Sequence, residues 1–437
     1  MTNKEQILEK ITSNEAIVGI IGLGYVGLPL AVSFAQANIK VIGFDKNPEK
    51  VRKINSGENY IGDITEQELQ SVVNGEYLIA TDRFDRIFEC NVLIICVPTP
   101  LDIFKKPDMS YIESACREIG QNMKPGTFIS LESTTYPTTT ENLMMPILER
   151  ESGLKQGVDF WLAYSPERVD PGNDTYKTKN TPKVLGAMSD DGLEIGEAIY
   201  KKAIQNVHLV SSPRVAEMVK ILENTYRLIN ISLINELALL AGKMDINIWE
   251  VIDAAKTKPF GFQAFYPGPG IGGHCIPLDP FYLEYIAKQY DFDLTMIHTA
   301  GHINMRMPHY MYIKIASALN KNEKSVSGSK ILFLGVAYKP NIDDERESPA
   351  LEIIDTVTAK GGLVSYNDPY IPMIKTHNGV SLKSVELTPE TLSRADVVVI
   401  TTNHRDYDSD FIMKHSNLIV DLRNVMTPDD KNKVFKL

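Results

Sequence analysis

Runs of consecutive apolar residues, each closed by glycine, proline or hydroxyl residues, recur along the first part of the chain. They occupy residues 16–22, 41–45, 92–97, 127–132 and 160–164, and residues 28–37 have the composition of a helix. A short, wholly apolar run is typical of a strand buried on both faces, and alternation with helices favours a parallel sheet. The pattern therefore predicts an α/β domain with a doubly wound sheet.

The pattern changes near residue 212, and breakers are so few from Ser212 to about Asp245 that a single long helix is predicted. Polar residues recur on it every three or four positions and so share one face: Glu217, Lys220, Glu223, Asn224 and Arg227. Such a stripe is ordinarily a solvated face, and a central helix of this length is typical of a dimer interface. The alternative is a functional face, on which Lys220 would stabilise an oxyanion.

The last hundred residues repeat the order of the first hundred in outline. Apolar runs at 330–335, 363–368, 396–402 and 418–423 correspond in order to the first four runs of the N-terminal part. A polar, breaker-rich stretch at 321–329 precedes them. We therefore predict an α/β fold with two Rossmann-like doubly wound domains joined by a long central helix, with boundaries at 1–210, 211–325 and 326–437.

The first apolar run opens into a glycine-rich turn that is a candidate dinucleotide site. Strand, G-x-G-x-x-G turn, helix, second strand and Asp45 follow in the order of the Rossmann fingerprint, and its turn residues are Gly22, Gly24, Tyr25, Val26 and Gly27. Backbone N–H groups of the turn can approach a pyrophosphate, and Asp45 can accept from ribose hydroxyls. Ordinary turns also mimic a bare glycine pattern, but here the strand, helix and acid accompany it. Because a carboxylate repels a 2′-phosphate, the expected cofactor is NAD rather than NADP.

Small polar residues stand where the next runs end, at the edge where a parallel sheet lines its cofactor crevice. Pro98 and Thr99 follow one run, Thr134 follows the next, and Glu167 follows the run at 160–164. Ordinary loops after strands carry the same residue types, so each residue alone has a purely structural explanation. Together they predict a cofactor rim at the carboxyl ends of the strands.

Residues 266–280 contain too many glycines and prolines for a regular helix or strand to run through them. Such a loop can bring backbone close to a ligand, and it carries one thiol, Cys275, with the carboxylate of Asp279 four positions on. A thiolate in this setting can act as a nucleophile. The alternative is a tight turn with a buried cysteine.

Three basic residues stand at strand ends or adjoining loops of the C-terminal domain: Lys339, Arg346 and Arg423. This domain has no G-x-G-x-x-G turn, so a second dinucleotide is not expected. Basic groups at such positions can hold a diphosphate through charge-assisted hydrogen bonds. Each alone is equally consistent with a surface charge, and their shared location favours the binding role.

Composition narrows the function classes. The 437 residues are 43% hydrophobic and 23% charged, as in ordinary soluble proteins, and the formal charge of −11 argues against a nucleic-acid partner. Four cysteines make neither a disulfide framework nor a zinc spacing, so no metal site is expected. The N-terminus lacks the apolar core of a signal peptide, and no run approaches the roughly 18 residues of a membrane span. We expect a cytoplasmic protein with no membrane partner.

In these features the chain resembles the nucleotide-sugar 6-dehydrogenases, the UDP-glucose/GDP-mannose dehydrogenase family, over essentially its whole length. The matching segments lie at 22–27, 97–100, 132–135, 165–167, 220–224, 272–279, 339 and 346–348. Members of that family oxidise the C6 hydroxymethyl group of a sugar to a carboxylate, using two NAD per sugar and a covalent thioester. A thiolate suits this chemistry because its adduct with an aldehyde presents a second hydride.

The resemblance implies a catalytic role for several candidates. Cys275 would be the nucleophile, and Lys220 with Asn224 would stabilise oxyanions at C6. Asp279 would help to activate the hydrolytic water, and Glu167 would act in acid–base steps.

The resemblance also implies binding roles. Thr134 would order a water near C6 and contact the cofactor, and Arg346 would reach the cofactor from the C-terminal domain. Residues assigned to the UDP-sugar are Lys220, Asn224, Phe265, Tyr266, Gly272, Lys339 and Arg423.

The cysteine loop departs from the version that many UDP-glucose enzymes carry, Phe-Gly-Gly-Ser-Cys-Phe-x-Lys-Asp. Here residues 271–279 read Ile-Gly-Gly-His-Cys-Ile-Pro-Leu-Asp. This version resembles the branch that acts on UDP-N-acetylhexosamines, so the expected substrate is UDP-N-acetylglucosamine. UDP-glucose and UDP-N-acetylmannosamine are the alternatives.

Two rival functions are considered. A two-electron hydroxyacid dehydrogenase also pairs a Rossmann domain with a helical one, but it gives no role to Cys275 or to the second α/β domain. A non-catalytic NAD-binding sensor gives no role to Lys220, Cys275 and Asp279 together. The expectation is therefore a homodimeric NAD-dependent enzyme, paired through the central helix, with its active site between the two domains.

Overall fold

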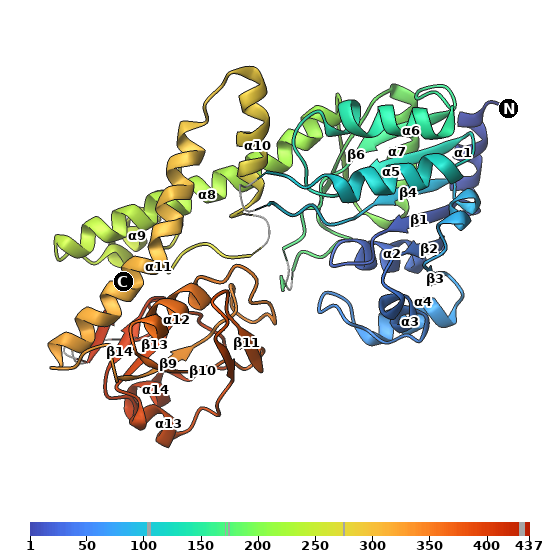
Figure 1. Ribbon diagram of the computed structural model, residues 1–437. Coiled ribbons are helices and arrows are strands. Elements are labelled where there is room, and N and C mark those ends of the chain that lie inside the picture. The colour runs from blue at the N-terminus through green and yellow to red at the C-terminus, as the bar shows by residue number, and fades with distance from the viewer. Residues whose placement is uncertain (103–105, 171, 174, 274–275, 428–432) are drawn as a thin grey trace. The chain divides into compact units, whose positions relative to one another are not determined.

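The computed structural model describes residues 1–102, 106–170, 172–173, 175–273, 276–427 and 433–437. The chain forms two compact units, Met1–Glu223 with Phe281–Phe292 and Asn224–Pro280 with Asp293–Leu437. Helix α8 (Pro213–Lys243) contributes residues to both units, which confirms the predicted long helix (Figure 1). Within the described ranges, none of the helices combines the length and apolar character needed to cross a bilayer.

The first unit is built on one eight-stranded sheet with the order β3-β2-β1-β4-β5-β6-β7-β8. Its strands are β1 (Ile17–Ile21), β2 (Lys40–Phe44), β3 (Leu78–Thr81), β4 (Val92–Ile95), β5 (Thr127–Leu131), β6 (Phe160–Tyr164), β7 (Lys183–Ala187) and β8 (Val207–Val210). Strands β1 to β6 are parallel, β7 is antiparallel to β6, and β8 is parallel to β7. The five predicted strands are confirmed, whereas β3, β7 and β8 were not predicted.

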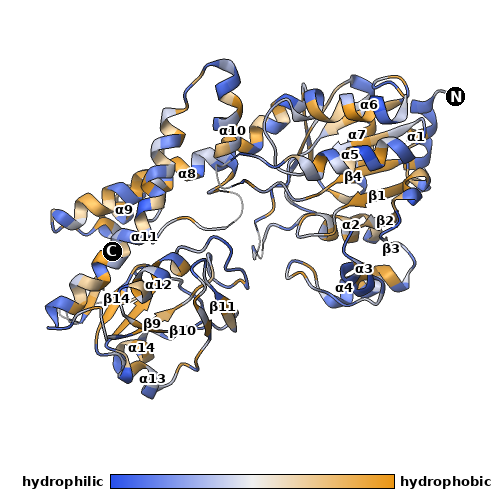
Figure 2. Ribbon diagram, in the orientation of Figure 1, coloured by the Kyte–Doolittle hydropathy of each residue, from blue (hydrophilic) through white to orange (hydrophobic). Residues whose placement is uncertain are grey.

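Helices cover both faces of this sheet, as a doubly wound fold requires. One face packs against α1 (Asn3–Thr12), α2 (Gly27–Gln36), α3 (Pro48–Asn55), α4 (Glu66–Asn74) and α7 (Asp190–Ala203). The other packs against η1 (Phe84–Glu89), α5 (Ser110–Asn122), the π-helical η2 (Thr140–Met144) and α6 (Met145–Ser152). The strands other than the edge strand β8 are apolar along most of their length because they are largely buried on both faces (Figure 2).

The second unit contains a five-stranded parallel sheet with the order β10-β9-β13-β14-β15. Its strands are β9 (Lys330–Leu334), β10 (Leu363–Asn367), β13 (Val397–Ile400), β14 (Ile419–Asp421) and β15 (Val434–Lys436), and β11 (Met373–Lys375) pairs separately with β12 (Ser381–Lys383). The neighbours β10-β9-β13-β14 repeat β2-β1-β4-β5 of the first sheet. The predicted repetition of strand order is therefore confirmed.

The second sheet is also covered on both faces. One face packs on α11 (Thr295–Lys321) and α12 (Pro349–Ala359), and the other on α13 (Pro389–Arg394) and α14 (Ser409–His415). Helices α9 (Ile248–Ala255) and α10 (Asp279–Ala287) and the single turn η3 (Lys288–Tyr290) lie in the middle of the chain. Helix α9 packs its Ile248, Trp249 and Ile252 against the apolar side chains of α8.

Candidate functional site

The glycine-rich turn after β1 leads directly into α2. Gly22 has a φ of 93°, and a Cβ on Gly27 would lie 1.9 Å from the carbonyl oxygen of Gly22, so a side chain at Gly27 would prevent this turn. Among the described residues none caps α2 through its side chain, and none in its first turn is acidic. A helix start without an acidic side chain suits a pyrophosphate, so the turn fits the predicted dinucleotide.

Asp45 lies at the end of β2, where the prediction requires an acid. Its carboxylate accepts hydrogen bonds from the N–H groups of Leu23 (3.0 Å) and Asn47 (2.9 Å) and lies 3.4 Å from Lys50 Nζ. The hydroxyl of Tyr60 donates to the carbonyl oxygen of Leu23. Asp45 is thus oriented by the turn itself, while Tyr25 and Val26 remain partly or largely exposed.

The loops after β4 and β5 contact each other at the predicted cofactor rim. Ser133 Oγ donates to the carbonyl oxygen of Val97 at 2.7 Å, and Thr134 beside it is half-buried. Pro98 is exposed, and the carbonyl oxygen of Thr99 accepts a hydrogen bond from the Tyr282 hydroxyl. The rim residues thus lie on adjacent strand ends, β4 beside β5.

The structure brings Glu167 and Lys220 together, although the contact uses the backbone of Glu167. The ammonium of Lys220, which is 8% exposed, donates to the carbonyl oxygen of Glu167 at 2.7 Å. The carboxylate of Glu167 accepts from the N–H groups of Arg168 (2.8 Å) and Val169 (2.7 Å). The helix that carries Lys220 and the strand end that carries Glu167 are therefore joined in the first unit.

Sequence reasoning missed a buried ion pair behind Glu167. Lys183 Nζ lies 2.8 Å from Glu132 Oε2 and 3.9 Å from Glu167 Oε2, and the Tyr200 hydroxyl donates to Glu132 at 2.7 Å. Burial opposes the charge of Lys183, but the carboxylates of Glu132 and Glu167 outweigh it and raise the pKa of the ammonium. Glu132 lies in a matching segment of the sequence, but only the fold pairs it with a lysine on β7.

Asn224 and Asp279 form a second buried contact, in the second unit. Asn224 Nδ2 donates to Asp279 Oδ2 at 2.5 Å, and the two residues are 6% and 2% exposed. Farther along α8, the Asn235 side-chain oxygen accepts from the Gly268 N–H at 2.9 Å. The loop before α10 is therefore attached to α8 near both of its ends, while Cys275 within it lies outside the described residues.

The first part of that loop packs on the second sheet domain. A Cβ on Gly272 would lie 2.7 Å from the Cβ of Tyr338, and Gly273 N–H donates to the carbonyl oxygen of Arg346 at 3.1 Å. Arg346 itself forms a bidentate pair with Asp344, and Lys339 is half-buried next to Tyr338. The structure thus brings Gly272 together with the loop that holds Lys339 and Arg346.

Arg423 follows β14 and lies against Gly268, in the loop before α10. Its Nε donates to the Thr401 carbonyl oxygen at 2.7 Å, and a Cβ on Gly268 would lie 2.6 Å from its Nη1. Burial lowers the pKa of this guanidinium to about 10, against the attraction of Asp421. A desolvated cation held by a backbone carbonyl is suited to an anionic ligand.

Two predicted substrate residues pack against aromatic neighbours. The rings of Phe265 and Tyr226 are 5.8 Å apart, edge to face, and Tyr266 stacks on Trp249 at 6.0 Å. Tyr266 remains 46% exposed. These contacts fix both rings beside α8 and α9, and the assignment of the rings to the substrate stays a prediction.

The polar stripe on α8 is not uniformly solvated. Glu217, Lys220 and Asn224 are buried, Glu223 pairs with Arg168 at 2.6 Å, and Arg227 is exposed. The opposite face of the helix instead exposes apolar side chains: Val215, Met218, Leu222, Tyr226, Leu233, Leu237 and Leu240. The stripe is therefore buried at Glu217, Lys220 and Asn224 and solvated at Arg227.

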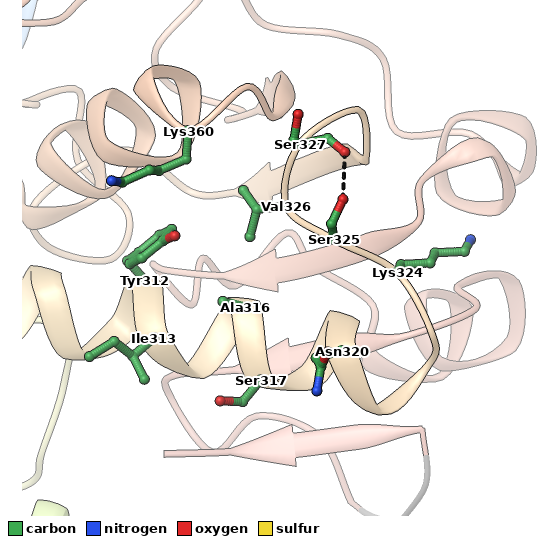
Figure 3. Close-up of a pocket in the computed structure, with 10 residues that line it drawn as sticks. All are labelled: Tyr312, Ile313, Ala316, Ser317, Asn320, Lys324, Ser325, Val326, Ser327 and Lys360. Atoms are coloured by element: carbon green, nitrogen blue, oxygen red, sulfur yellow. Dashed lines mark hydrogen bonds between the residues drawn. The ribbon is translucent and has the colours of Figure 1, made fainter.

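A separate hollow of about 520 Å³ lies between the end of α11, the following loop and the end of α12 (Figure 3). Tyr312, Lys324 and Lys360 line it, but none of the predicted site residues does. Its lysines follow the C-terminal ends of two helices, where cations are stabilised by the helix dipole. The helix ends explain these charges without a ligand.

Comparison with known proteins gives three consecutive family matches. They are the NAD binding domain (residues 16–204), the central domain (214–306) and the UDP binding domain (332–428) of the UDP-glucose/GDP-mannose dehydrogenase family. UDP-N-acetyl-D-mannosamine dehydrogenase of Pyrococcus horikoshii is 37% identical over 426 residues, covering 96% of this chain and 98% of that protein. UDP-N-acetyl-D-glucosamine 6-dehydrogenase of Pseudomonas aeruginosa is 35% identical over 355 residues, covering 81% and 83%.

Solved structures show the same similarity to nucleotide-sugar dehydrogenases. The UDP-D-ManNAc dehydrogenase of Pyrococcus horikoshii superposes with a TM-score of 0.87 at 35% identity, over 96% of this chain and 98% of that one. The NDP-N-acetyl-D-galactosaminuronic acid dehydrogenase of Methanosarcina mazei gives 0.82 at 30% identity, over 100% and 97%. The chain therefore belongs to the UDP-glucose/GDP-mannose dehydrogenase family and is an NAD-dependent nucleotide-sugar dehydrogenase.

Proposed function

We propose that the protein oxidises the C6 hydroxymethyl group of a UDP-N-acetylhexosamine to the uronate, with two NAD consumed per sugar. The observation that carries the proposal is the pair of buried contacts on successive turns of α8. Lys220 is bonded to the backbone of Glu167, and Asn224 is bonded to Asp279 at the end of the cysteine loop. Buried polar side chains so arranged supply the donors that C6 chemistry needs.

The N-acetylhexosamine class is supported by the cysteine loop, Ile271–Asp279, and by the names of the relatives. The sequence favours UDP-N-acetylglucosamine. Relatives include both mannosamine and glucosamine dehydrogenases, with 37% and 35% identity. These two sugars differ only in configuration at C2, and the substrate assay below distinguishes them.

The chemistry that NAD supplies when bound is acceptance of one hydride in each oxidation. The residues that would hold it lie on the first sheet, apart from Arg346: Gly22, Gly24, Tyr25, Val26, Gly27, Asp45, Pro98, Thr99 and Thr134. Asp45 would accept from the ribose hydroxyls, and the start of α2 would face the pyrophosphate.

The reaction we propose proceeds through Cys275. The C6 alcohol loses a hydride from carbon and a proton from oxygen, with Glu167 and a water held by Thr134 assisting the proton transfer. The thiolate of Cys275 adds to the aldehyde, and Lys220 and Asn224 stabilise the oxyanion. Loss of a second hydride leaves a thioester. Water attacks this thioester with help from Asp279 and releases the carboxylate and the thiol.

The uridine diphosphate would be held by the second unit. Lys339 and Arg423 supply positive charge, and Phe265, Tyr266 and Gly272 belong to the segment that packs beside them. The contact of Arg423 with Thr401 and Gly268 supports this assignment, because it fixes the guanidinium at a strand end.

We also propose a homodimer formed through α8. Seven apolar side chains on one face of this helix are exposed, from 39% for Met218 to 60% for Leu222, and they recur at helical spacing between residues 215 and 240. A stripe that long, roughly 38 Å at about 1.5 Å per residue, can pair with its own copy about a two-fold axis. Leu222→Glu with Leu237→Glu should give a monomer in sedimentation velocity. Arg227→Glu, on another face, should leave the dimer intact, and a wild-type monomer would contradict the proposal.

The function is tested by following NADH absorbance with a panel of UDP- and GDP-sugars. Wild type should release two NADH per UDP-N-acetylhexosamine, without free aldehyde. Cys275→Ala should bind both ligands but form no uronate, and Cys275→Ser should accumulate an adduct that mass spectrometry detects. One NADH per sugar would indicate a two-electron dehydrogenase, and NAD binding without turnover of any sugar would indicate a sensor.

A further inference from the structure

Glu217 is a fully buried acid on the first turns of α8, with a relative exposure of 0%. Its Oε2 accepts from the Thr138 N–H at 2.6 Å, and its Oε1 accepts from both the N–H (2.9 Å) and the hydroxyl (2.8 Å) of Thr140. Burying a carboxylate is costly unless its lone pairs are satisfied, and here three donors from one short segment satisfy them. The carboxylate thus fastens that segment to α8.

The fastened segment, residues 133–140, is the loop that follows β5 and carries Thr134. Thr138 within it has a φ of 87°, which is unfavourable for a β-branched residue. The hydroxyls of Thr135 and Thr139 are hydrogen-bonded at 2.5 Å, and Thr139 also donates to the Tyr136 carbonyl oxygen. Strained backbone of this kind persists only where its surroundings fix it, and Glu217 accepts the N–H of the strained residue itself.

Helix α8 carries both Glu217 and the candidate catalytic residue Lys220. Lys220 lies three positions after Glu217, on the same side of the helix, and its ammonium is bonded to the Glu167 carbonyl oxygen. A single turn of α8 therefore holds the Thr134 loop through Glu217 and the Glu167 strand end through Lys220. All of these residues belong to the first unit.

We propose that Glu217 is a positioning residue, which fixes Thr134 relative to Lys220 and so sets the geometry around C6. The inference rests on the proposed function for the roles of Thr134 and Lys220. A simpler role for Glu217 is to satisfy the start of η2, which would affect stability alone. The two roles differ in their kinetic consequences, because a misplaced catalytic group lowers kcat without weakening ligand binding.

The test compares Glu217→Gln with a matched control on the same two elements. Arg214 of α8 pairs with Glu141 of η2 through an exposed salt bridge, so Arg214→Gln cuts a second link between α8 and the same region. In Glu217→Gln an amide NH₂ replaces one acceptor and meets a donor from Thr138 or Thr140. We expect kcat for NADH release to fall about 10- to 100-fold in Glu217→Gln. The dissociation constant for UDP should change less than about twofold, and Arg214→Gln should behave as wild type.

Hydrogen exchange of peptides covering residues 133–140 gives a readout that does not depend on turnover. Exchange should accelerate in Glu217→Gln and stay unchanged in Arg214→Gln. If Glu217→Gln does not fold, Thr140→Val removes only the hydroxyl bond to Glu217 and should lower kcat several-fold with faster exchange.

The outcomes distinguish a failure of the positioning role from a failure of the proposed function. An active wild type with unchanged kcat in Glu217→Gln, or in Thr140→Val where that variant replaces it, overturns the positioning role. A wild type that oxidises no UDP-sugar overturns the proposed function, and the exchange data then decide whether Glu217 orders the Thr134 loop. Unchanged exchange in the tested variant overturns that as well.

Discussion

The two sheet domains share a strand order but differ in the turn that follows the first strand. In the first domain, β1 ends at Ile21 and α2 begins at Gly27, so a tight turn presents the start of a helix in the way that suits a pyrophosphate. In the second, β9 ends at Leu334 and α12 begins only at Pro349. The long connection carries Lys339 and Arg346 instead. The sheet is the same scaffold in both, and the turn decides which ligand class it suits.

The acid at the end of the second strand shows the same difference. Asp45 accepts from two N–H groups of its own turn and stays partly exposed. Asp368, which follows β10, is buried and accepts from the N–H groups of Val336 and Ala337 and from the ring of His404. His404 accepts the Asn341 N–H at Nδ1, so its Nε2 carries the proton that it donates to Asp368. Asp368 therefore holds the start of the loop that follows β9.

The largest effect should come from removing Asp368. Asp368→Ala would leave buried N–H groups and His404 without their acceptor, and we expect a loss of about 3–5 kcal/mol of stability in the second domain. Hydrogen exchange over β9, β10 and β13 would measure it. Asp45→Ala should cost the first domain less than about 1 kcal/mol. Equal losses in the two variants would contradict the contrast between the two acids.

The two domains should also respond oppositely to pH. Burial raises the pKa of Glu217 from 4.5 to about 7, despite the hydrogen bonds from Thr140 and Thr138 and with some repulsion from Glu141. Burial opposes ionisation of Asp368 too, but the bonds from His404 and the Val336 N–H outweigh it and lower its pKa below 3.8. The contribution of Glu217 is therefore full below pH 4.5 and is lost as pH rises through 7, whereas that of Asp368 is lost only as pH falls below 3.8.

Between pH 5 and pH 8 the first domain should accordingly lose up to about 3 kcal/mol of stability through Glu217, and the second should lose nothing through Asp368. Domain-resolved hydrogen exchange measures both. Arg214 and Tyr136 also face Glu217, so the Glu217→Gln variant is the control that isolates its titration. The same pH dependence in that variant would contradict the assignment.

Arg423 in the second domain should matter for UDP alone. Arg423→Met should weaken UDP binding about 10- to 100-fold, because a charge-assisted contact to phosphate is lost. NAD binding should be unchanged. Arg394, which pairs with Glu390 on the surface of α13, provides the control, and Arg394→Met should leave both affinities unaltered in calorimetry. Unchanged UDP affinity in Arg423→Met would remove Arg423 from the diphosphate site.

The smallest effect concerns cofactor choice in the first domain. Asp45→Ser combined with Lys46→Arg should shift the NAD-to-NADP preference by about tenfold, because a repulsive carboxylate is replaced beside the 2′ position. Steady-state kinetics with each cofactor would measure the ratio. A wild type that uses both cofactors equally would show that Asp45 does not set the choice.

The sequence by itself determined the parts of this protein that depend on local pattern. Apolar runs placed β1, β2, β4, β5 and β6 and the repeated strand order of the second domain, because a strand buried on both faces must be apolar throughout. The spacing of the glycines and Asp45 predicts a dinucleotide-binding turn for a similar reason. Close backbone approach and helix starts are encoded within a few residues.

Only the tertiary structure decided how the polar residues are used. The pattern on α8 could not show that Glu217 and Asn224 are buried while leucines on the opposite face are exposed, because burial depends on what packs against a helix. Likewise, Asp45 and Asp368 hold equivalent positions in the two sheet domains, each directly after the second strand. The hydrogen bonds of the two carboxylates differ because Asp368 has a partner, His404, on a loop 36 residues farther along the chain. A hydrogen-bond partner that distant is not encoded in the local pattern of apolar and polar residues, so only the fold reveals it.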